Sequence, residues 1–369
     1  MNKKITDFFR DDIDILNEYK VHDSEGLVKL DAMENPYDHE VMVDTNVTPS
    51  IDFKTTEFKN YFGAYVNINR YPDANCKNLK KGLINKYGLD KKYDSIIGNG
   101  SDELIQLICL AFLKSENVVL CPQPSFSMYK KISQVLGLKF QEVPLLEDFS
   151  LDTNQMVKKI EELNPALIFL AYPNNPTGNL WDKEDIDLIL NKANGVVVID
   201  EAYGAFSGES FIKQLDNYDN LLVMKTISKV GLAGLRLGYL FGEKSIIKKI
   251  DKLRLPFNIN SISQEMGKLY TENEEFIYSQ TKEIIKNRDY LFSMMKDIED
   301  IKVYDSKTNF ILFRLLKGSS DEVFRNLLAD KILIKNMSNT PGLENCLRVT
   351  IGTKEENILF IKSLKNSII

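Results

Sequence analysis

Histidine and cysteine are scarce in this chain of 369 residues, which contains two histidines and four cysteines. Catalysis that depends on histidine has only His22 and His39 to use. The cysteines, at positions 76, 109, 121 and 346, lie far apart and form no CxxC pair. This spacing argues against a zinc site and against a disulfide framework, and it fits a reducing cytoplasm. We therefore expect a cytoplasmic protein without a metal site.

Long apolar runs and an excess of basic charge are also missing. No uninterrupted apolar segment approaches the roughly 20 residues of a membrane span, and the charged N-terminal segment lacks an apolar signal core. The net charge is −6 and the pI is near 5.3, which gives no support for a nucleic-acid or membrane partner. Without GxSxG, HExxH or GxxxxGK[ST] patterns, serine-hydrolase, zincin and P-loop interpretations are weak.

The length of the chain predicts a large domain and a smaller one. From about residue 95 to residue 242, strands alternate with helices, which predicts an α/β fold with a mostly parallel sheet covered on both faces. After residue 256, long charged helices and short strands predict an α+β domain. We predict an N-terminal arm (1–40) that packs with the small domain, a large domain (41–255) and the small domain (256–369).

Local signals predict several shorter elements. Residues 27–30 are predicted to form a short strand, and residues 74–87 an amphipathic helix that ends at Gly88. A further helix begins at residue 101, with Ser101 or Asp102 as its N-cap. Residues 41–58 show little periodicity and are predicted to be a loop or linker.

Polar or reactive side chains follow five of the predicted strands. Parallel sheets bind ligands at the carboxyl ends of their strands, so these side chains are expected to lie at one edge. The five groups occupy residues 99–102, 125–126, 174–175, 200–203 and 226–229.

Lys229 lies in a turn rich in hydroxyl groups and glycine, in the stretch MKTISKVGLAGLRLGYLFG (224–242). Burial lowers the pKa of a lysine and favours the neutral, nucleophilic amine. The neighbouring hydroxyls, the glycine amides and Arg236 are groups that bind phosphate. This stretch predicts a lysine that forms a Schiff base with a phosphate-bearing aldehyde. Taken alone, it is equally compatible with a surface lysine in a loop.

The side chains at the other strand ends match the contacts that pyridoxal phosphate needs. Its ring nitrogen needs a carboxylate, which Asp200 supplies at the end of an apolar strand. Its phenolic oxygen needs donors such as Asn175 and Tyr203, and Phe126 could stack on the ring. Taken singly, Asp200 could instead be a capping or structural group, and Phe126 a core aromatic residue.

Eight segments together resemble one family. They occur in the family's order over about residues 27–353 and read LDAMENPY, NRYPD, GNGSDELI, PQPSFSMY, AYPNNPTGN, VVIDEAY, TISKVGLAGLRLGY and CLRVTIGT. They resemble the fold-type I pyridoxal-phosphate aminotransferases, and within them the histidinol-phosphate aminotransferase family. The resemblance implies a large domain with a mostly parallel seven-stranded sheet, pyridoxal 5'-phosphate as cofactor and a homodimer.

The resemblance also implies residue roles. Lys229 would be the catalytic Schiff-base lysine, Asp200 would pair with the pyridine nitrogen, and Asn175 and Tyr203 would bind the phenolic oxygen, with the ring on Phe126. The remaining cofactor contacts would be Ser101, Asp102, Thr226, Ser228 and Arg236 around the phosphate, with Tyr71 reaching the phosphate site of the neighbouring subunit. The predicted substrate-binding residues are Tyr19, Asn35, Lys335 and Arg348.

Some positions depart from the family pattern. Many relatives read LNANENP where this chain has Asp31 and Met33, and the stacking residue Phe126 is often a tyrosine. The loop from Lys229 to Arg236 is one residue shorter than in some members. Lys335 stands where relatives have an arginine that helps to hold the substrate phosphate. Lysine is a point charge without the bidentate fork of arginine.

The resemblance implies a transaminase that moves an amino group from histidinol phosphate to 2-oxoglutarate, giving glutamate, in histidine biosynthesis. An aromatic amino-acid aminotransferase is the main alternative, because it uses the same apparatus and Lys335 weakens the case for a phosphate-bearing donor. A threonine-phosphate decarboxylase and a non-catalytic cofactor-binding module are further alternatives.

Overall fold

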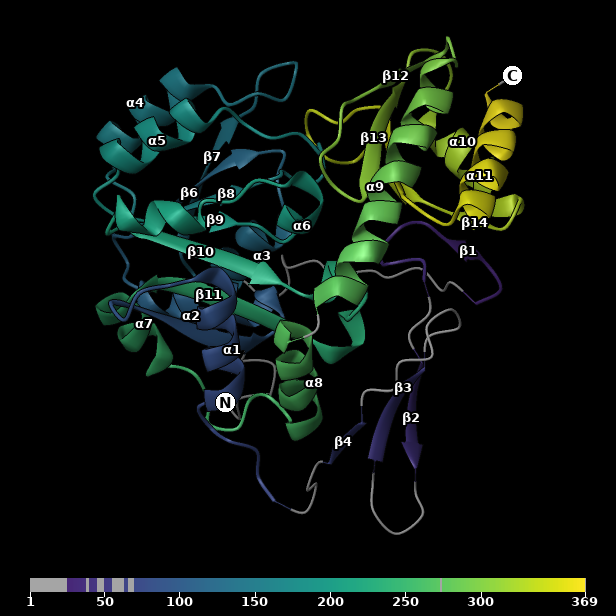
Figure 1. Ribbon diagram of the computed structural model, residues 1–369. Coiled ribbons are helices and arrows are strands. Elements are labelled where there is room, and N and C mark those ends of the chain that lie inside the picture. Colours follow the sequence, from purple (N-terminus) through teal and green to yellow (C-terminus); the bar gives the residue numbers. More distant parts are fainter. Residues whose placement is uncertain are drawn as a thin grey trace, which may run out of the picture.

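A seven-stranded sheet organises the larger part of the molecule. The computed structural model describes residues 25–37, 40–44, 50–54, 63–65, 70–272 and 274–368. The strand order is β5-β11-β10-β9-β8-β6-β7 (Figure 1). The strands are β5 (Tyr93–Asn99), β6 (Val118–Gln123), β7 (Lys139–Pro144), β8 (Leu167–Ala171), β9 (Val196–Asp200), β10 (Leu221–Thr226) and β11 (Leu237–Glu243). In this sheet β11 is antiparallel to both neighbours and the other pairs are parallel, which confirms the predicted fold class.

Both faces of this sheet are buried, which explains the uninterrupted apolar run of β9. Val196 and Val198 pack into one hydrophobic cluster, whereas Val197 and Ile199 pack into the cluster on the opposite face. Successive side chains of a strand point to opposite faces, so a strand covered on both sides has only apolar positions. The helices that follow or flank these strands are α1 (Lys77–Tyr87), α2 (Ser101–Ala111), α3 (Ser127–Leu136), α4 (Thr153–Leu163), α5 (Lys183–Lys192) and α7 (Lys244–Asp251).

The start of α2 differs from the prediction. Gly100, not Ser101 or Asp102, is the N-cap residue, with φ 84° and ψ 168°. A side chain at this position would be strained at that φ, and a Cβ atom on Gly100 would lie 2.7 Å from Nη2 of Arg236. The prediction was wrong because the close approach of Arg236 requires a glycine there, and the side-chain cap preference was overridden.

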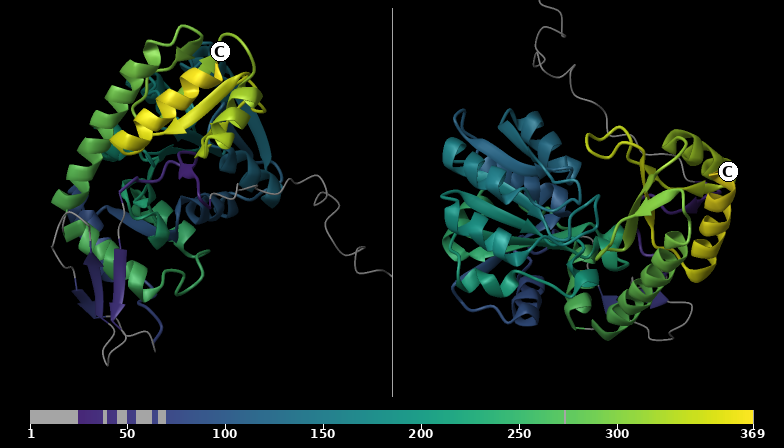
Figure 2. Two further views of the ribbon diagram at one scale, coloured as in Figure 1. Left: turned by 90° about the vertical axis from the view of Figure 1, so that its right-hand side faces the viewer. Right: turned by 90° about the horizontal axis from the view of Figure 1, so that it is seen from above.

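A second, smaller sheet lies beside the first and carries the C-terminal helices (Figure 2). Its four strands are antiparallel, in the order β12-β13-β16-β15. The strands are β12 (Ile301–Val303), β13 (Phe310–Leu315), β15 (Lys335–Asn336) and β16 (Cys346–Thr350), and the helices packed with them are α9 (Glu274–Lys296), α10 (Ser320–Ala329) and α11 (Lys354–Ser367).

The N-terminal arm joins this second unit. Its short strand β1 (Val28–Lys29), which the sequence predicted, pairs in parallel with β14 (Ile332–Leu333). Helix α8 (Ser261–Glu272) packs instead on α1 of the larger unit, and Ile259 belongs to the same core cluster as α1. The predicted division at residue 256 stays a proposal, and this packing favours a boundary nearer to α9.

The prediction of a loop for residues 41–58 was wrong for the two parts of this range that the structure describes, residues 41–44 and 50–54. Strands β2 (Glu40–Asp44) and β3 (Ser50–Lys54) form an antiparallel sheet with β4 (Gly63–Tyr65). Apolar and polar residues alternate within β3, which reads SIDFK, but five residues are too few for this period to stand out.

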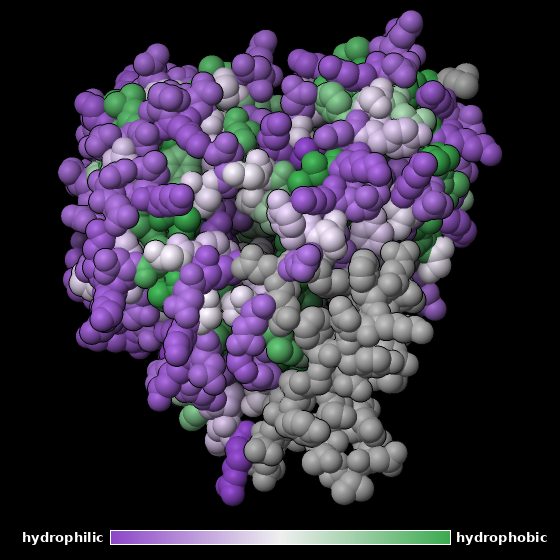
Figure 3. Space-filling view, viewed as in Figure 1, coloured by the Kyte–Doolittle hydropathy of each residue, from purple (hydrophilic) through white to green (hydrophobic). Residues whose placement is uncertain are grey.

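The surface of the described chain is largely polar. On the face shown in Figure 3, hydrophilic residues surround small groups of hydrophobic ones. Within the described ranges, no helix combines the length and the apolar character that a bilayer crossing requires.

Replacing Gly238 of β11 with alanine is expected to destabilise the protein. A Cβ atom there would lie 2.7 Å from both the Gly100 carbonyl carbon and the Ser101 amide nitrogen, which are backbone atoms. Overpacking of this kind costs about 1–3 kcal/mol, measured as the free energy of unfolding in urea. Gly234→Ala is the matched control, because its Cβ atom would meet nothing within 4 Å. Equal stability of the two variants would contradict the tight contact between β11 and α2.

Candidate active site

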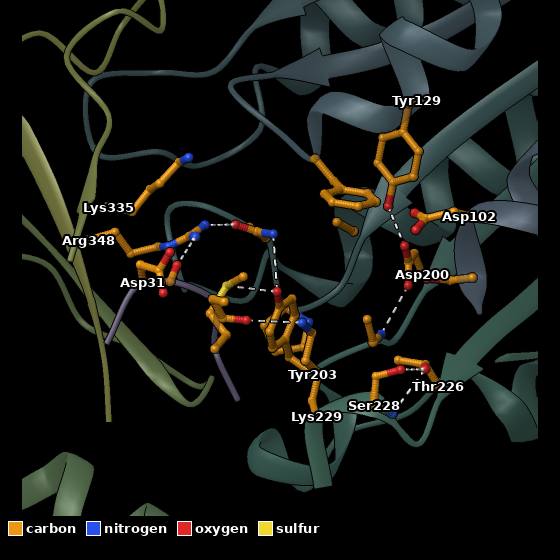
Figure 4. Close-up of a pocket in the computed structure, with 18 of the residues that line it drawn as sticks. Asp31, Asp102, Tyr129, Asp200, Tyr203, Thr226, Ser228, Lys229, Lys335 and Arg348 are labelled. Atoms are coloured by element: carbon orange, nitrogen blue, oxygen red, sulfur yellow. Dashed lines mark hydrogen bonds between the residues drawn. The ribbon is translucent and has the colours of Figure 1, made fainter. Parts of the chain in front are cut away.

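A cavity of about 300 Å³ lies at the carboxyl edge of the large sheet, between this sheet and the smaller unit. Its volume is at the lower end of the range for small-molecule sites. The cavity brings together twelve residues that the sequence singled out, namely Ser101, Asp102, Phe126, Asn175, Asp200, Tyr203, Thr226, Ser228, Lys229, Arg236, Lys335 and Arg348. Figure 4 shows Lys335 and Arg348 on the side opposite Asp200 and Tyr129.

Asp200 provides a buried carboxylate at the end of β9. Its Oδ2 accepts a hydrogen bond of 2.6 Å from the Tyr129 hydroxyl, and its Oδ1 accepts one of 3.0 Å from the Ala202 amide. Burial raises the pKa of Asp200 to about 6, although both hydrogen bonds act in the opposite direction. An ionised carboxylate in this place is stabilised by a cationic partner.

Asn175 and Tyr203 lie together in the floor of the cavity. Asn175 Nδ2 donates to the Tyr203 hydroxyl at 3.1 Å, and Arg348 Nη1 donates to Asn175 Oδ1 at 2.5 Å. The Tyr203 hydroxyl in turn lies 3.0 Å from Met33 Sδ, which is a weak acceptor. The Tyr203 hydroxyl can therefore turn its hydrogen toward a better acceptor in the cavity.

Lys229 follows β10 in a short 3₁₀ turn (Ser228–Val230). Its Nζ lies 3.5 Å from the Ala32 carbonyl oxygen and 5.8 Å from the centre of the Tyr203 ring. Burial, followed by the positive charge of Arg348, lowers the pKa of Lys229 to about 8. The amine is therefore a much better nucleophile near neutral pH than an ordinary lysine.

The start of α2 forms one end of the cavity with Arg236. The Arg236 guanidinium is half-exposed and lies 3.6 Å from a carboxylate oxygen of Asp102. Thr226 Oγ1 accepts from the Ser228 amide at 3.1 Å and lies 2.9 Å from Ser228 Oγ. A helix N-terminus, hydroxyl groups and a guanidinium are the groups that bind a phosphate dianion.

Two cations from the smaller unit form the opposite wall. Lys335 of β15 and Arg348 of β16 are directly opposed in the strand register. Arg348 is buried, donates from Nη2 to the Asp31 carbonyl oxygen at 3.2 Å, and lies over the Phe310 ring at 5.1 Å. This wall attracts an anionic group.

Comparison with known families now identifies the chain. A model of the family "Aminotransferase class I and II" matches residues 25–364. The chain belongs to this family.

Similar proteins point to one branch of these aminotransferases. The chain is 42% identical to "Histidinol-phosphate aminotransferase 2" of Nitrosococcus oceani over 98% of both chains. The crystal structure of the histidinol-phosphate aminotransferase from Clostridium acetobutylicum is 28% identical, with a TM-score of 0.76 over 81% of this chain and 91% of that one. The L-threonine-O-3-phosphate decarboxylase from Porphyromonas gingivalis is 25% identical, with a TM-score of 0.71 over 81% of this chain and 90% of that one.

Membership of this family confirms three predictions. The fold is that of the aminotransferases, the protein is a transaminase, and its cofactor is pyridoxal phosphate. The resemblance that eight short segments carried in the sequence is therefore confirmed over most of the chain.

The cavity of this aminotransferase fits the cofactor. Among the described residues, Asp200 has neutral hydrogen-bond donors but no ion pair, so a protonated ring nitrogen would supply the missing cation. The glycines at 100 and 238 leave the space in which Arg236 and the start of α2 come together. The residues present thus match the amine, carboxylate and phosphate contacts that the cofactor requires.

Two predicted site residues, Tyr71 and Asn35, lie outside the cavity. Tyr71 is 82% exposed and stacks on Phe257 with 4.7 Å between ring centres. Asn35 does not line the cavity, and its Nδ2 donates to Gln280 Oε1 at 3.0 Å. Tyr19 lies outside the described residues.

Sequence reasoning missed three residues that line the cavity, Asp31, Met33 and Tyr129. The departures of Asp31 and Met33 from the family pattern were visible, but nothing in the sequence placed them in the cavity. Tyr129 follows Phe126 by three residues at the start of a predicted helix. That spacing puts both side chains on one face of a helix, so the position of Tyr129 near the cavity could have been predicted from that of Phe126.

The lowered pKa of Lys229 predicts how the protein without cofactor captures pyridoxal phosphate. Only the neutral amine attacks an aldehyde, so the capture rate should rise with pH and level off above about 8, the pKa of Lys229. The rate is measured by stopped-flow absorbance between pH 6 and 10, with an exposed lysine in a short peptide as the reference. An inflection near 10.5, the ordinary value, would show that the amine is not perturbed.

Proposed function

We propose that this aminotransferase transfers the amino group of histidinol phosphate to 2-oxoglutarate in histidine biosynthesis. The observation that carries the proposal is the cavity itself, which has cofactor contacts along one side and the cations Lys335 and Arg348 on the other. A donor with a phosphate group suits such a wall. The names of the curated relatives, such as the one from Nitrosococcus oceani, support the same donor.

Lys229, Asp200 and Tyr203 have separate roles in the proposed reaction. When bound, pyridoxal phosphate supplies an aldehyde that condenses with amines and a ring that withdraws electrons from the substrate α-carbon. Lys229 Nζ, with its lowered pKa, can accept the proton that leaves that carbon. Asp200 would hold a positive charge at the ring nitrogen, and Tyr203 and Asn175 would hold the phenolic oxygen. Ser101, Ser228 and Arg236 would hold the phosphate.

Arg348 would serve the two substrates in turn. Histidinol phosphate carries a phosphate and 2-oxoglutarate carries a carboxylate at each end, and one wall has to bind an anionic group of each during the transfer cycle. The planar guanidinium binds either a phosphate or a carboxylate in a bidentate manner, whereas Lys335 contributes a point charge. This sharing is consistent with two cations of different shape on neighbouring strands.

We further propose that the enzyme acts as a homodimer in the cytoplasm. Tyr71 is the most exposed of the large hydrophobic residues that are described, and its stacking on Phe257 holds the ring outward. Such a ring is suited to reach the cofactor phosphate of a second subunit. Tyr19 would cover the substrate.

Replacing Lys229 with alanine tests the chemistry. The variant is expected to lose turnover by several orders of magnitude, because both the nucleophile and the base are removed. Borohydride reduction should no longer leave cofactor bound covalently, as read by mass spectrometry. Lys225→Ala is unsuitable as a control because Lys225 pairs with buried Glu201, so the exposed Lys213→Ala, outside the cavity, serves instead. Full activity of Lys229→Ala would disprove the assignment.

Replacing Lys335 tests the donor. Lys335→Met should lower kcat/KM for histidinol phosphate about tenfold or more, because one charge-assisted contact to the phosphate is lost. Phenylalanine and tyrosine should be much less affected, and Lys335→Arg should retain the activity with histidinol phosphate. The assay uses a panel of these donors with 2-oxoglutarate. Preference for the aromatic donors in the unmodified enzyme would favour an aromatic aminotransferase, and carbon dioxide release from threonine phosphate would favour a decarboxylase.

A further inference from the structure

Tyr129 is a buried titratable residue of the cavity that the proposed chemistry does not use. Its side chain is fully buried, and its ring stacks on Phe169 with 4.8 Å between centres and 10° between planes. Phe126 meets it edge-on at 5.5 Å. The ring is therefore fixed on both sides, and its hydroxyl points to one partner, Oδ2 of Asp200, at 2.6 Å.

We propose that Tyr129 is a positioning residue that keeps Asp200 ionised and correctly oriented for the ring nitrogen of the cofactor. Asp200 has two oxygens and little freedom to rotate. The Ala202 amide holds Oδ1 and the Tyr129 hydroxyl holds Oδ2. Hydrogen bonds to a carboxylate favour its charged form, and the charged form is the one that pairs with a protonated ring nitrogen.

The hydroxyl of Tyr129 remains a donor across the working pH range. Burial, followed by the charge of Asp200, raises the pKa of Tyr129 well above its ordinary value. It therefore stays protonated at neutral pH. The tyrosine side chain is also uncharged. It therefore lowers the free-energy cost of burying the Asp200 carboxylate without forming an ion pair that would replace the one with the cofactor.

The surroundings of the pair oppose ionisation of Asp200, which makes the contribution of Tyr129 necessary. Asp102 of α2 and Glu201 beside β9 both raise the pKa of Asp200 by their charges. The other titratable groups that face Tyr129 are Cys121 of β6 and Tyr203. Among these described groups none is a cation, so the neutral donors Tyr129 and Ala202 carry the stabilisation.

Tyr129→Phe is the test, because it removes one oxygen and keeps the stacked ring. We expect the dissociation constant for pyridoxal phosphate to rise about tenfold, since one hydrogen bond to a charged group is lost. It is measured by absorbance titration of the full-length protein without an amino donor. The result therefore depends on the cofactor and is independent of whether histidinol phosphate is the donor.

Tyr93→Phe is a matched control. The Tyr93 hydroxyl likewise donates to a carboxylate, Asp216 Oδ1, at 2.7 Å, but Asp216 is exposed, also pairs with Lys92, and neither Tyr93 nor Asp216 lines the cavity. Tyr93→Phe should leave the cofactor affinity unchanged. Equal weakening by both variants would overturn the proposal, because it would indicate a general loss of stability.

A double-mutant cycle tests whether Tyr129 acts through Asp200. In an Asp200→Asn background the added Tyr129→Phe change should alter the cofactor affinity by less than about twofold. An undiminished tenfold effect there would overturn the proposal, because Tyr129 would then act directly or through packing.

The pH dependence of stability gives a readout that a packing role would not produce. Because burial raises the pKa of Asp200 from 3.8 to about 6 on folding, its ionisation makes the free energy of unfolding fall as pH rises between these values. Without the Tyr129 hydroxyl the folded pKa is higher, so the fall continues to higher pH. The stability difference between Tyr129→Phe and the unmodified, cofactor-free chain should therefore be constant well below pH 6 and grow as the pH rises through about 6, the folded pKa of the unmodified chain. A difference that stays constant above pH 6 contradicts the proposal.

Discussion

The burial of the Asp200 carboxylate is the constraint around which this site is built. The apolar residues of β9 must be covered on both faces of the sheet, so the first charged side chain appears only where the strand ends. A carboxylate there costs free energy unless donors and a cation meet it. The fold supplies the donors, and the cation has to come from a ligand. The same parallel arrangement brings the ends of β8 and β10, with Asn175 and Lys229, to the same edge.

Glu201 follows Asp200 directly in the chain, but its charge is neutralised by a partner within the protein. The Glu201 side chain is fully buried and pairs with Lys225 of β10, while its oxygens also accept from the Phe211 amide and the Ser210 hydroxyl. Glu201 is thus neutralised within the protein, whereas Asp200 is left to a bound partner. These two adjacent carboxylates therefore differ in their partners. Glu201 has a lysine within the protein, whereas Asp200, which faces the cavity, has only neutral hydrogen-bond donors.

The sequence could bring together the cavity residues of the large sheet because they follow strand ends, and periodicity locates strand ends. Lys229, Asp200 and Asn175 each follow an apolar run. The substrate half was less accessible. Asp31 and Met33 reach the cavity only because β1 pairs with β14, some 300 positions away in the chain. Tyr71, which the sequence predicted to contact the cofactor of a neighbouring subunit, lies outside the cavity of its own chain. The N-cap of α2 was predicted wrongly because the contact that requires a glycine at position 100 is made by Arg236, which is also distant in sequence.

Met33 connects these two halves physically. It adopts a left-handed backbone with φ 56°, which is unusual for a residue of this kind, and it is held from three directions. Its amide donates to Thr350 Oγ1 at 2.8 Å, its carbonyl accepts from Asn309 Nδ2 at 3.0 Å, and its sulfur lies against the Tyr203 hydroxyl. The first two partners belong to the smaller unit and the third to the cofactor site.

The arm therefore links the smaller unit to the side chain of Tyr203 in the cavity. Arg348 acts in parallel, since it contacts Asp31 of the arm and Asn175 of the large sheet. Asn175 is bonded in turn to Tyr203, so Arg348, Asn175 and Tyr203 form one chain of hydrogen bonds from the smaller unit to the large sheet. Three contacts join residues 31–33 and 348 to the residues of the large sheet, namely Arg348 to Asn175, Met33 to Tyr203, and Ala32 to Lys229.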